Sequence, residues 1–188
     1  MVEWLDKLTM NFLISLIYAP LVVFSLKYFD IKFVSIFIFI FSLIWFAILF
    51  NKNKKETIFP IVYLLIAIFA FFMQDFILLK STPVVISSLV TIIFLLSYLR
   101  KKSILLYFID KFSKKIIPSQ EKEYIHKSTL FWVIISFVNT LIHLKIFFGN
   151  NIEFWIYYSS FGWYAIFIIA GIVQFLHRKF IFLKRVYD

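Results

Sequence analysis

The stretch Phe33–Phe50, FVSIFIFIFSLIWFAILF, contains no charged residue, glycine or proline and is the clearest structural signal in the chain. A helix that crosses a bilayer needs about 20 mostly apolar residues, and this stretch comes close to that length. Further apolar runs occur at residues 10–26, 57–73, 83–99, 129–148 and 154–176. The sequence therefore predicts an all-α fold, a polytopic membrane helix bundle with six transmembrane helices. Pro20 interrupts the short first run, so a bundle of five spans is the alternative.

The composition also indicates a membrane protein. Of the 188 residues, 63% are hydrophobic and 16% are charged, whereas soluble domains have about 45–50% and about 25%. Six spans would use about 120 residues, so we expect residues 1–188 to form a single integral membrane domain. The chain has no cysteine, which excludes disulfides and cysteine-ligated metals.

Basic residues are distributed unevenly between the two sides of the predicted bundle. Sixteen of the 20 lysines and arginines lie in the N-terminal segment, the 51–56 loop, the 100–128 segment and the C-terminal tail. Cytoplasmic loops carry such an excess, so we expect a multi-pass protein of the bacterial inner (cytoplasmic) membrane with both termini in the cytoplasm. Orientation accounts for the net charge of +10, and no nucleic-acid partner is expected. Residues 1–10 lack the features of a cleaved signal peptide, so we expect them to be retained.

The 100–128 segment is expected to be a basic cytoplasmic loop that contains an amphipathic helix at 103–117. Its apolar residues recur at 3- and 4-residue spacing: Leu105, Phe108, Ile109, Phe112 and Ile116. Such a helix would lie in the membrane interface, with Lys111, Lys114 and Lys115 among anionic headgroups. Two interpretations stay open: a loop that only sets orientation, or an element that binds lipid or a protein partner.

Polar side chains at membrane depth are the other candidate functional residues. The fifth run carries Ser136, Asn139, Thr140 and His143 at helical spacing, which predicts a polar stripe on one helix face. The stripe would either hydrogen-bond to a neighbouring helix or line a polar pathway or headgroup pocket. Gln74–Asp75, with Lys80 and residues 81–83, is expected to form a short turn on the outer side.

Aromatic residues near the ends of the predicted spans are interpreted as interface anchors. These residues are Trp132, Trp155, Tyr157 and Tyr158. The chain has no motif for phosphate binding, a nucleophilic serine or a metal, so we expect no catalytic centre and no cofactor.

The second half resembles a family of uncharacterised bacterial inner-membrane proteins related to the intracellular septation protein A family. The resemblance covers residues 124–178 and rests on Asn139 together with Tyr124, Thr129, Trp132, Trp155, Tyr158, Tyr164, Gln174 and Arg178. The chain departs from that pattern at Ser159–Ser160, where Asn-Gly is expected, and at Gln174, where Glu is expected. A looser similarity in the first half rests on residues 20–24 and 75–77. The resemblance implies a role in cell-envelope biogenesis or septation, or an association with lipid synthesis.

These observations favour a non-catalytic accessory or binding factor in cell-envelope or lipid biogenesis, with envelope or lipid-synthesis proteins and membrane lipids as partners. The first alternative is a small transporter or lipid-moving protein with Asn139 and His143 along its pathway. Six short helices enclose too little space for a wide pathway, so a transporter of this kind could be a homo-oligomer. The second alternative is a membrane enzyme on lipid-linked substrates, with His143 or Asp75 as acid or base.

Overall fold

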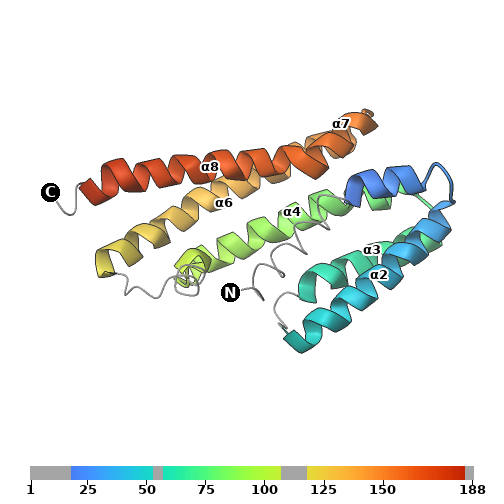
Figure 1. Ribbon diagram of the computed structural model, residues 1–188, viewed down its shortest axis with the longest axis horizontal. Helices are drawn as coiled ribbons and strands as arrows, with labels where there is room; N and C mark the ends of the chain where they lie inside the picture. The colour runs from blue at the N-terminus through green and yellow to red at the C-terminus, as the bar shows by residue number, and fades with distance from the viewer. Residues whose placement is uncertain (1–17, 53–56, 107–117, 185–188) are drawn as a thin grey trace. The chain divides into compact units, whose positions relative to one another are not determined.

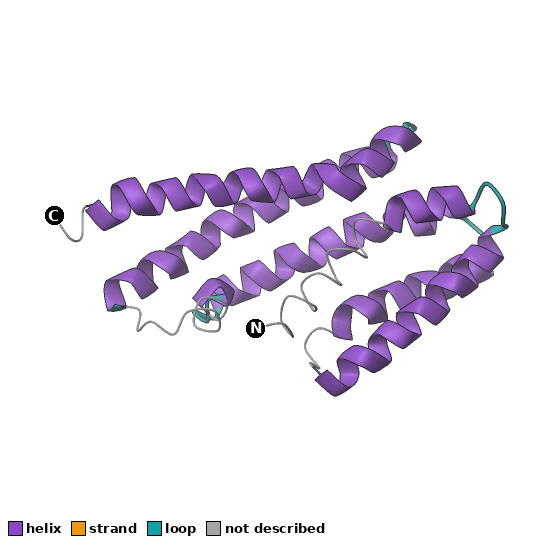
Figure 2. Cartoon of the chain, viewed as in Figure 1, coloured by secondary structure: helices purple, strands orange, loops and turns teal. Residues whose placement is uncertain are grey.

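The computed structural model describes residues 18–52, 57–106 and 118–184. Within these ranges every regular element is a helix and no strand occurs (Figure 2). The all-α fold class predicted from the sequence is therefore confirmed.

The chain divides into two compact units, each with its own internal contacts. The first unit comprises Met1–Ile86 and Lys145–Phe161, and the second comprises Ser87–Leu144 and Gly162–Asp188. Two long helices, α4 (Phe76–Leu99) and α6 (Ser119–Phe148), therefore contribute residues to both units.

Among the described residues, four helical segments are long and apolar enough to cross a membrane, so the chain is a membrane protein. They are Ile31–Asn51, Phe76–Leu99, Ser119–Phe148 and Ile152–Phe182 (Figure 1). The last of them is composed of α7 (Ile152–Tyr157), the π-helical turn η2 (Tyr158–Gly162), α8 (Trp163–His177) and a second π-helical turn η3 (Arg178–Phe182).

The other two predicted spans are not long enough within the described residues. The helix α3 (Ile58–Met73) is apolar but has 16 residues, fewer than the roughly 20 that a span perpendicular to the bilayer needs. Of the first predicted run, residues 18–25 are helical, and the part before residue 18 lies outside the described residues.

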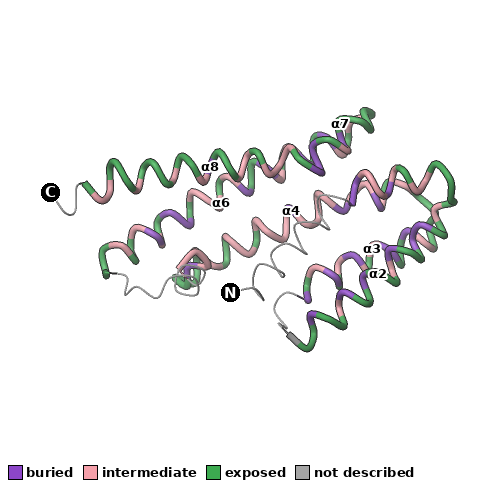
Figure 3. Tube along the Cα trace, in the orientation of Figure 1, coloured by how far each residue is buried: buried purple, intermediate pink, exposed green. Residues whose placement is uncertain are grey.

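In the first unit, α2 (Ile31–Lys52) packs side by side with α3 (Figure 1). The buried positions of the seam between them include the small residues Ser35 and Ser42 on α2 and Ala67 and Ala70 on α3, beside large side chains such as Trp45 and Tyr63. Small side chains let helix backbones approach closely in a membrane, where helices gain no hydrophobic energy by associating. Exposed apolar residues cover the outer faces of both helices (Figure 3), as expected for surfaces that meet lipid.

The turn between α3 and α4 is shorter than the sequence predicted. Gln74 ends α3 with a left-handed backbone (φ 53°), and its N–H donates to the Ala70 carbonyl at 2.9 Å. Asp75 then accepts the N–H of Ile77 at 2.8 Å through Oδ1 and so caps the next helix. α4 begins directly after this turn rather than near residue 83, and the residues expected in an outer turn lie inside the helix. The prediction that Lys80 and residues 81–83 belong to the turn was therefore wrong.

Pro83 lies within α4 and changes the hydrogen bonding of the preceding turn. Because proline has no N–H, the Leu79 carbonyl lacks its usual helical partner. The hydroxyl of Tyr18 donates to this carbonyl at 3.1 Å and lies 2.7 Å from the hydroxyl of Thr82. A buried side chain from residues 18–25 thus replaces the bond that the proline removes.

α6 begins at Ser119, earlier than the predicted start of the fifth span at residue 129. The basic loop is therefore shorter than the predicted 100–128 segment. Residues 107–117 lie outside the described residues, and with them most of the predicted amphipathic helix and all three of its candidate contact residues, Lys111, Lys114 and Lys115.

Candidate functional site

The predicted polar stripe on α6 exists and is buried. Ser136, Asn139 and His143 are 0%, 2% and 4% exposed, and Thr140 beside them is partly buried.

The stripe is hydrogen-bonded to two hydroxyl residues of α4 within the second unit. Asn139 donates through Nδ2 to Ser87 Oγ at 3.0 Å. The hydroxyls of Ser87 and Thr140 are 2.8 Å apart, and the hydroxyls of Thr91 and Thr140 are 3.0 Å apart. We call these residues, with Ser136 and His143, the α4–α6 polar cluster.

Each hydroxyl of the cluster has an acceptor for its proton. Thr140 Oγ1 lies 3.0 Å from the Ser136 carbonyl, and Thr91 Oγ1 lies 3.0 Å from the Ser87 carbonyl. A consistent order of donors runs from Asn139 to Ser87, from Ser87 to Thr140, and from Thr140 to the Ser136 carbonyl. Such mutual satisfaction is what buried polar groups require in an apolar surrounding.

Ser87 and Thr91 were missed by the sequence analysis. They lie four residues apart in a predicted span, the same spacing that identified the stripe on α6. The fourth span could therefore have been recognised as the partner of the fifth. What the sequence could not supply was the rotation of each helix, which decides whether the two polar faces meet.

The α4–α6 polar cluster contains hydroxyls, one amide and one imidazole, but no carboxylate. Among the described residues no group of three or more His, Asp or Glu side chains could hold a metal ion. The carboxylate considered for acid–base work, Asp75, lies in the turn before α4 and caps that helix through Oδ1. The geometry thus supplies interhelical hydrogen bonds and no pair of groups that resembles an acid and a base.

A second set of contacts joins α6 to α8 in the same unit, where the two helices lie side by side in Figure 1. The indole N–H of Trp132 donates to Gln174 Oε1. α6 also contacts the segment that follows α4, where the hydroxyls of Thr129 and Ser103 are 2.8 Å apart. The side-chain oxygen of Gln174 thus accepts a hydrogen bond between α6 and α8.

The start of α6 meets the end of α8 and η3. The Tyr124 hydroxyl lies 2.9 Å from His177 Nδ1, and the Tyr124 ring stacks on Phe182 with ring centroids 4.2 Å apart. Arg178 forms an ion pair with Glu121 and donates to it through both Nε and Nη2. Tyr124 and Arg178 thus link the two helices at this end of the second unit.

In the first unit, aromatic residues interpreted as interface anchors are instead buried. Trp155 is 1% exposed and donates its indole N–H to the Lys80 carbonyl at 3.2 Å, and Tyr158 is 7% exposed. Tyr157 is 62% exposed, as an interface residue would be. The anchor interpretation is therefore wrong for Trp155, whose ring packs against Phe76 and whose N–H bonds inside the unit.

The turn η2 contains two adjacent serines. Ser159 and Ser160 are buried, and neither hydroxyl has a hydrogen-bond partner within the described part of the chain. Tyr164, which follows this turn in α8, packs its ring on that of Trp163 with centroids 3.9 Å apart.

Comparison with protein-family models, with curated proteins and with solved structures gives no match to this chain.

Proposed function

We propose that this chain is a bacterial inner-membrane protein that acts by binding, as an accessory factor in cell-envelope or lipid biogenesis, rather than by catalysis. The observation that carries the proposal is the closure of the α4–α6 polar cluster, in which Asn139, Ser87 and Thr140 bond to one another. Polar groups used in this way stabilise helix packing. A transport path or an active site would need polar groups that reach a ligand.

The proposed orientation places both termini and the basic loop in the cytoplasm. It rests on the distribution of lysine and arginine, of which sixteen lie on one predicted side. In this orientation Lys111, Lys114 and Lys115 face anionic headgroups or an acidic partner from the envelope or lipid-synthesis machinery. The resemblance to the septation family favours such a partner.

The test is to change Lys111, Lys114 and Lys115 together to Gln and to measure association with anionic liposomes in a salt titration. A lysine near an anionic surface contributes about 1 kcal/mol, so we expect the association constant to fall by a factor on the order of 100 at low salt. The control is Lys122→Gln, Lys127→Gln and Lys179→Gln together, which removes three exposed charges of described helices. Association that is unchanged by the triple substitution at every salt concentration would refute the proposed role of the loop.

A second candidate function, a small transporter or lipid-moving protein, is favoured by one observation. His143 is 4% exposed one helical turn after Asn139, so a titratable side chain is buried on a helix that is long and apolar enough to span a membrane. If this function holds, His143→Ala abolishes complementation of a deletion strain while the protein still accumulates in the membrane. Full complementation by that variant would leave the binding role as the better account.

A further inference from the structure

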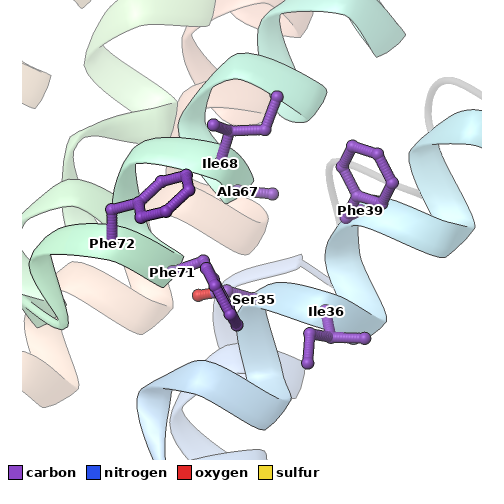
Figure 4. A pocket seen from close by; sticks show the side chains of 7 residues that line it. All are labelled: Ser35, Ile36, Phe39, Ala67, Ile68, Phe71 and Phe72. Carbon is purple, nitrogen blue, oxygen red and sulfur yellow. The ribbon is translucent and has the colours of Figure 1, made fainter.

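A groove lies between α2 and α3 on the outward side of their buried seam. It has a volume of about 240 Å³, and its walls are Ile36 and Phe39 from α2 and Phe71 and Phe72 from α3. Figure 4 shows these side chains around the groove, with Ala67 and Ser35 between the helices. The small side chains of the seam therefore also create the hollow at this place.

The groove offers a ligand only hydrocarbon contacts. Its single polar side chain, Ser35, donates its hydroxyl to the Ile31 carbonyl at 2.7 Å. The shape and chemistry fit a stretch of an acyl chain and do not fit a polar metabolite.

Charge complementarity at one end of the groove identifies the kind of lipid. Lys32 precedes Ser35 and Ile36 by three and four residues, so it lies on the same helix face. Side chains on a helix lean toward its N-terminus, which carries the Lys32 ammonium beyond the groove to the level of the headgroups.

The charged groups near the start of α2 decide what this end of the groove attracts. Asp30 directly precedes α2 and offsets the positive end of the helix dipole, so the positive charge on this face comes from the Lys32 side chain. Lys32 is exposed and forms no ion pair with a carboxylate of the residues that the structure describes.

We propose that this groove binds one acyl chain of an anionic phospholipid whose phosphate lies at the Lys32 ammonium. Hydrocarbon gains no hydrophobic energy by leaving the bilayer for an apolar groove, so the preference over bulk lipid comes from the charge at Lys32 and from packing against rigid aromatic rings. The proposal requires only that α2 and α3 are in contact with membrane lipid. It does not depend on the proposed cytoplasmic partner, so either proposal can fail alone.

The test uses the purified full chain in phosphatidylethanolamine vesicles that contain a phosphatidylglycerol with a photoactivatable diazirine in its acyl chain. After illumination, mass spectrometry compares the label on α2 and α3 with the label on the lipid-exposed face of α8. Ile68→Trp fills the groove from its exposed rim, and Ile172→Trp adds the same bulk to an exposed position on α8. Lys32→Gln removes the headgroup contact, and the exposed Lys27→Gln is its charge-matched control.

We expect label concentrated on α2 and α3, most of it lost in Ile68→Trp, and reduced about fivefold in Lys32→Gln, with both controls unchanged. Ile36→Trp, which fills the groove from α2, replaces Ile68→Trp if that variant does not fold. Label spread evenly over α2, α3 and α8 and unaffected by either groove filler would overturn the proposal. Label that depends on the groove but is unchanged in Lys32→Gln would overturn the assignment of the headgroup.

Discussion

Replacing Pro83 with alanine tests whether Tyr18 compensates for a hydrogen bond that the proline removes from α4. Tyr18 donates to the Leu79 carbonyl at 3.1 Å, and this carbonyl is the one that an N–H at position 83 would otherwise bind. Tyr18→Phe in the natural sequence leaves the carbonyl without a partner. The same change in a Pro83→Ala chain leaves it bonded to the restored N–H.

The expected cost of Tyr18→Phe in unfolding free energy differs between the natural sequence and the Pro83→Ala chain. A buried polar group without a partner costs about 1–3 kcal/mol, whereas the average interhelical hydrogen bond in a membrane contributes about 0.6 kcal/mol. Tyr18→Phe should therefore cost about 1.5 kcal/mol with Pro83 present. In the Pro83→Ala background it should cost only about 0.6 kcal/mol, for the lost contact with Thr82. The coupling energy is about 1 kcal/mol, roughly a fivefold change in the unfolding constant.

The measurement is unfolding in mixed micelles by stepwise addition of SDS, followed by far-UV circular dichroism, for the four members of the double-mutant cycle. Tyr28→Phe is the control, because Tyr28 is 69% exposed and its loss should change stability by less than about 0.5 kcal/mol. An equal cost of Tyr18→Phe in both backgrounds would show that the tyrosine does not compensate for the proline.

Three further predictions concern other parts of the chain. Asn139→Leu should lower the free energy of unfolding by about 0.6–1.7 kcal/mol, since it removes the donor to Ser87, and the same SDS titration measures it. Arg178→Lys should lower the free energy of unfolding by less than about 1 kcal/mol, because the contact of Arg178 with Glu121 is partly exposed. This loss of stability should become smaller as salt is added, and a loss independent of salt would contradict this account. Gln74→Gly should stabilise the chain by roughly 1 kcal/mol, because the left-handed backbone at φ 53° suits glycine, and a melting temperature that does not rise would contradict it.

The long apolar helices could be predicted from the sequence because their signal is local. Phe33–Phe50 has no polar interruption beyond two serines, and α2 forms across it. The start of α4 could not be predicted in this way. Pro83 is typical of a helix start, and only the contact from Tyr18, 61 residues away, accounts for its place inside the helix.

The candidate site was predicted in part. The helical spacing of Ser136, Asn139 and His143 identified a buried face correctly, because spacing determines which side chains share a face. The partner helix was missed because rotation about a helix axis depends on packing. The prediction for Trp155 was wrong because it relied on the general preference of indole rings for the membrane interface. In the structure the indole N–H donates to the Lys80 carbonyl inside the unit, so the ring does not need the interface.

The polar groups of this chain show why membrane depth alone is a weak guide to function. In lipid, apolar helices have little to fix their register, so hydrogen bonds between helices supply much of the specificity. Asn139 bonded to Ser87 serves that purpose within the second unit. The groove of α2 and α3 is different, because its surface has no unused polar group while an exposed lysine stands at its end. A side chain that contacts its neighbours is explained by the fold, whereas Lys32 has no such explanation in the described residues and is therefore the better place to look for a ligand.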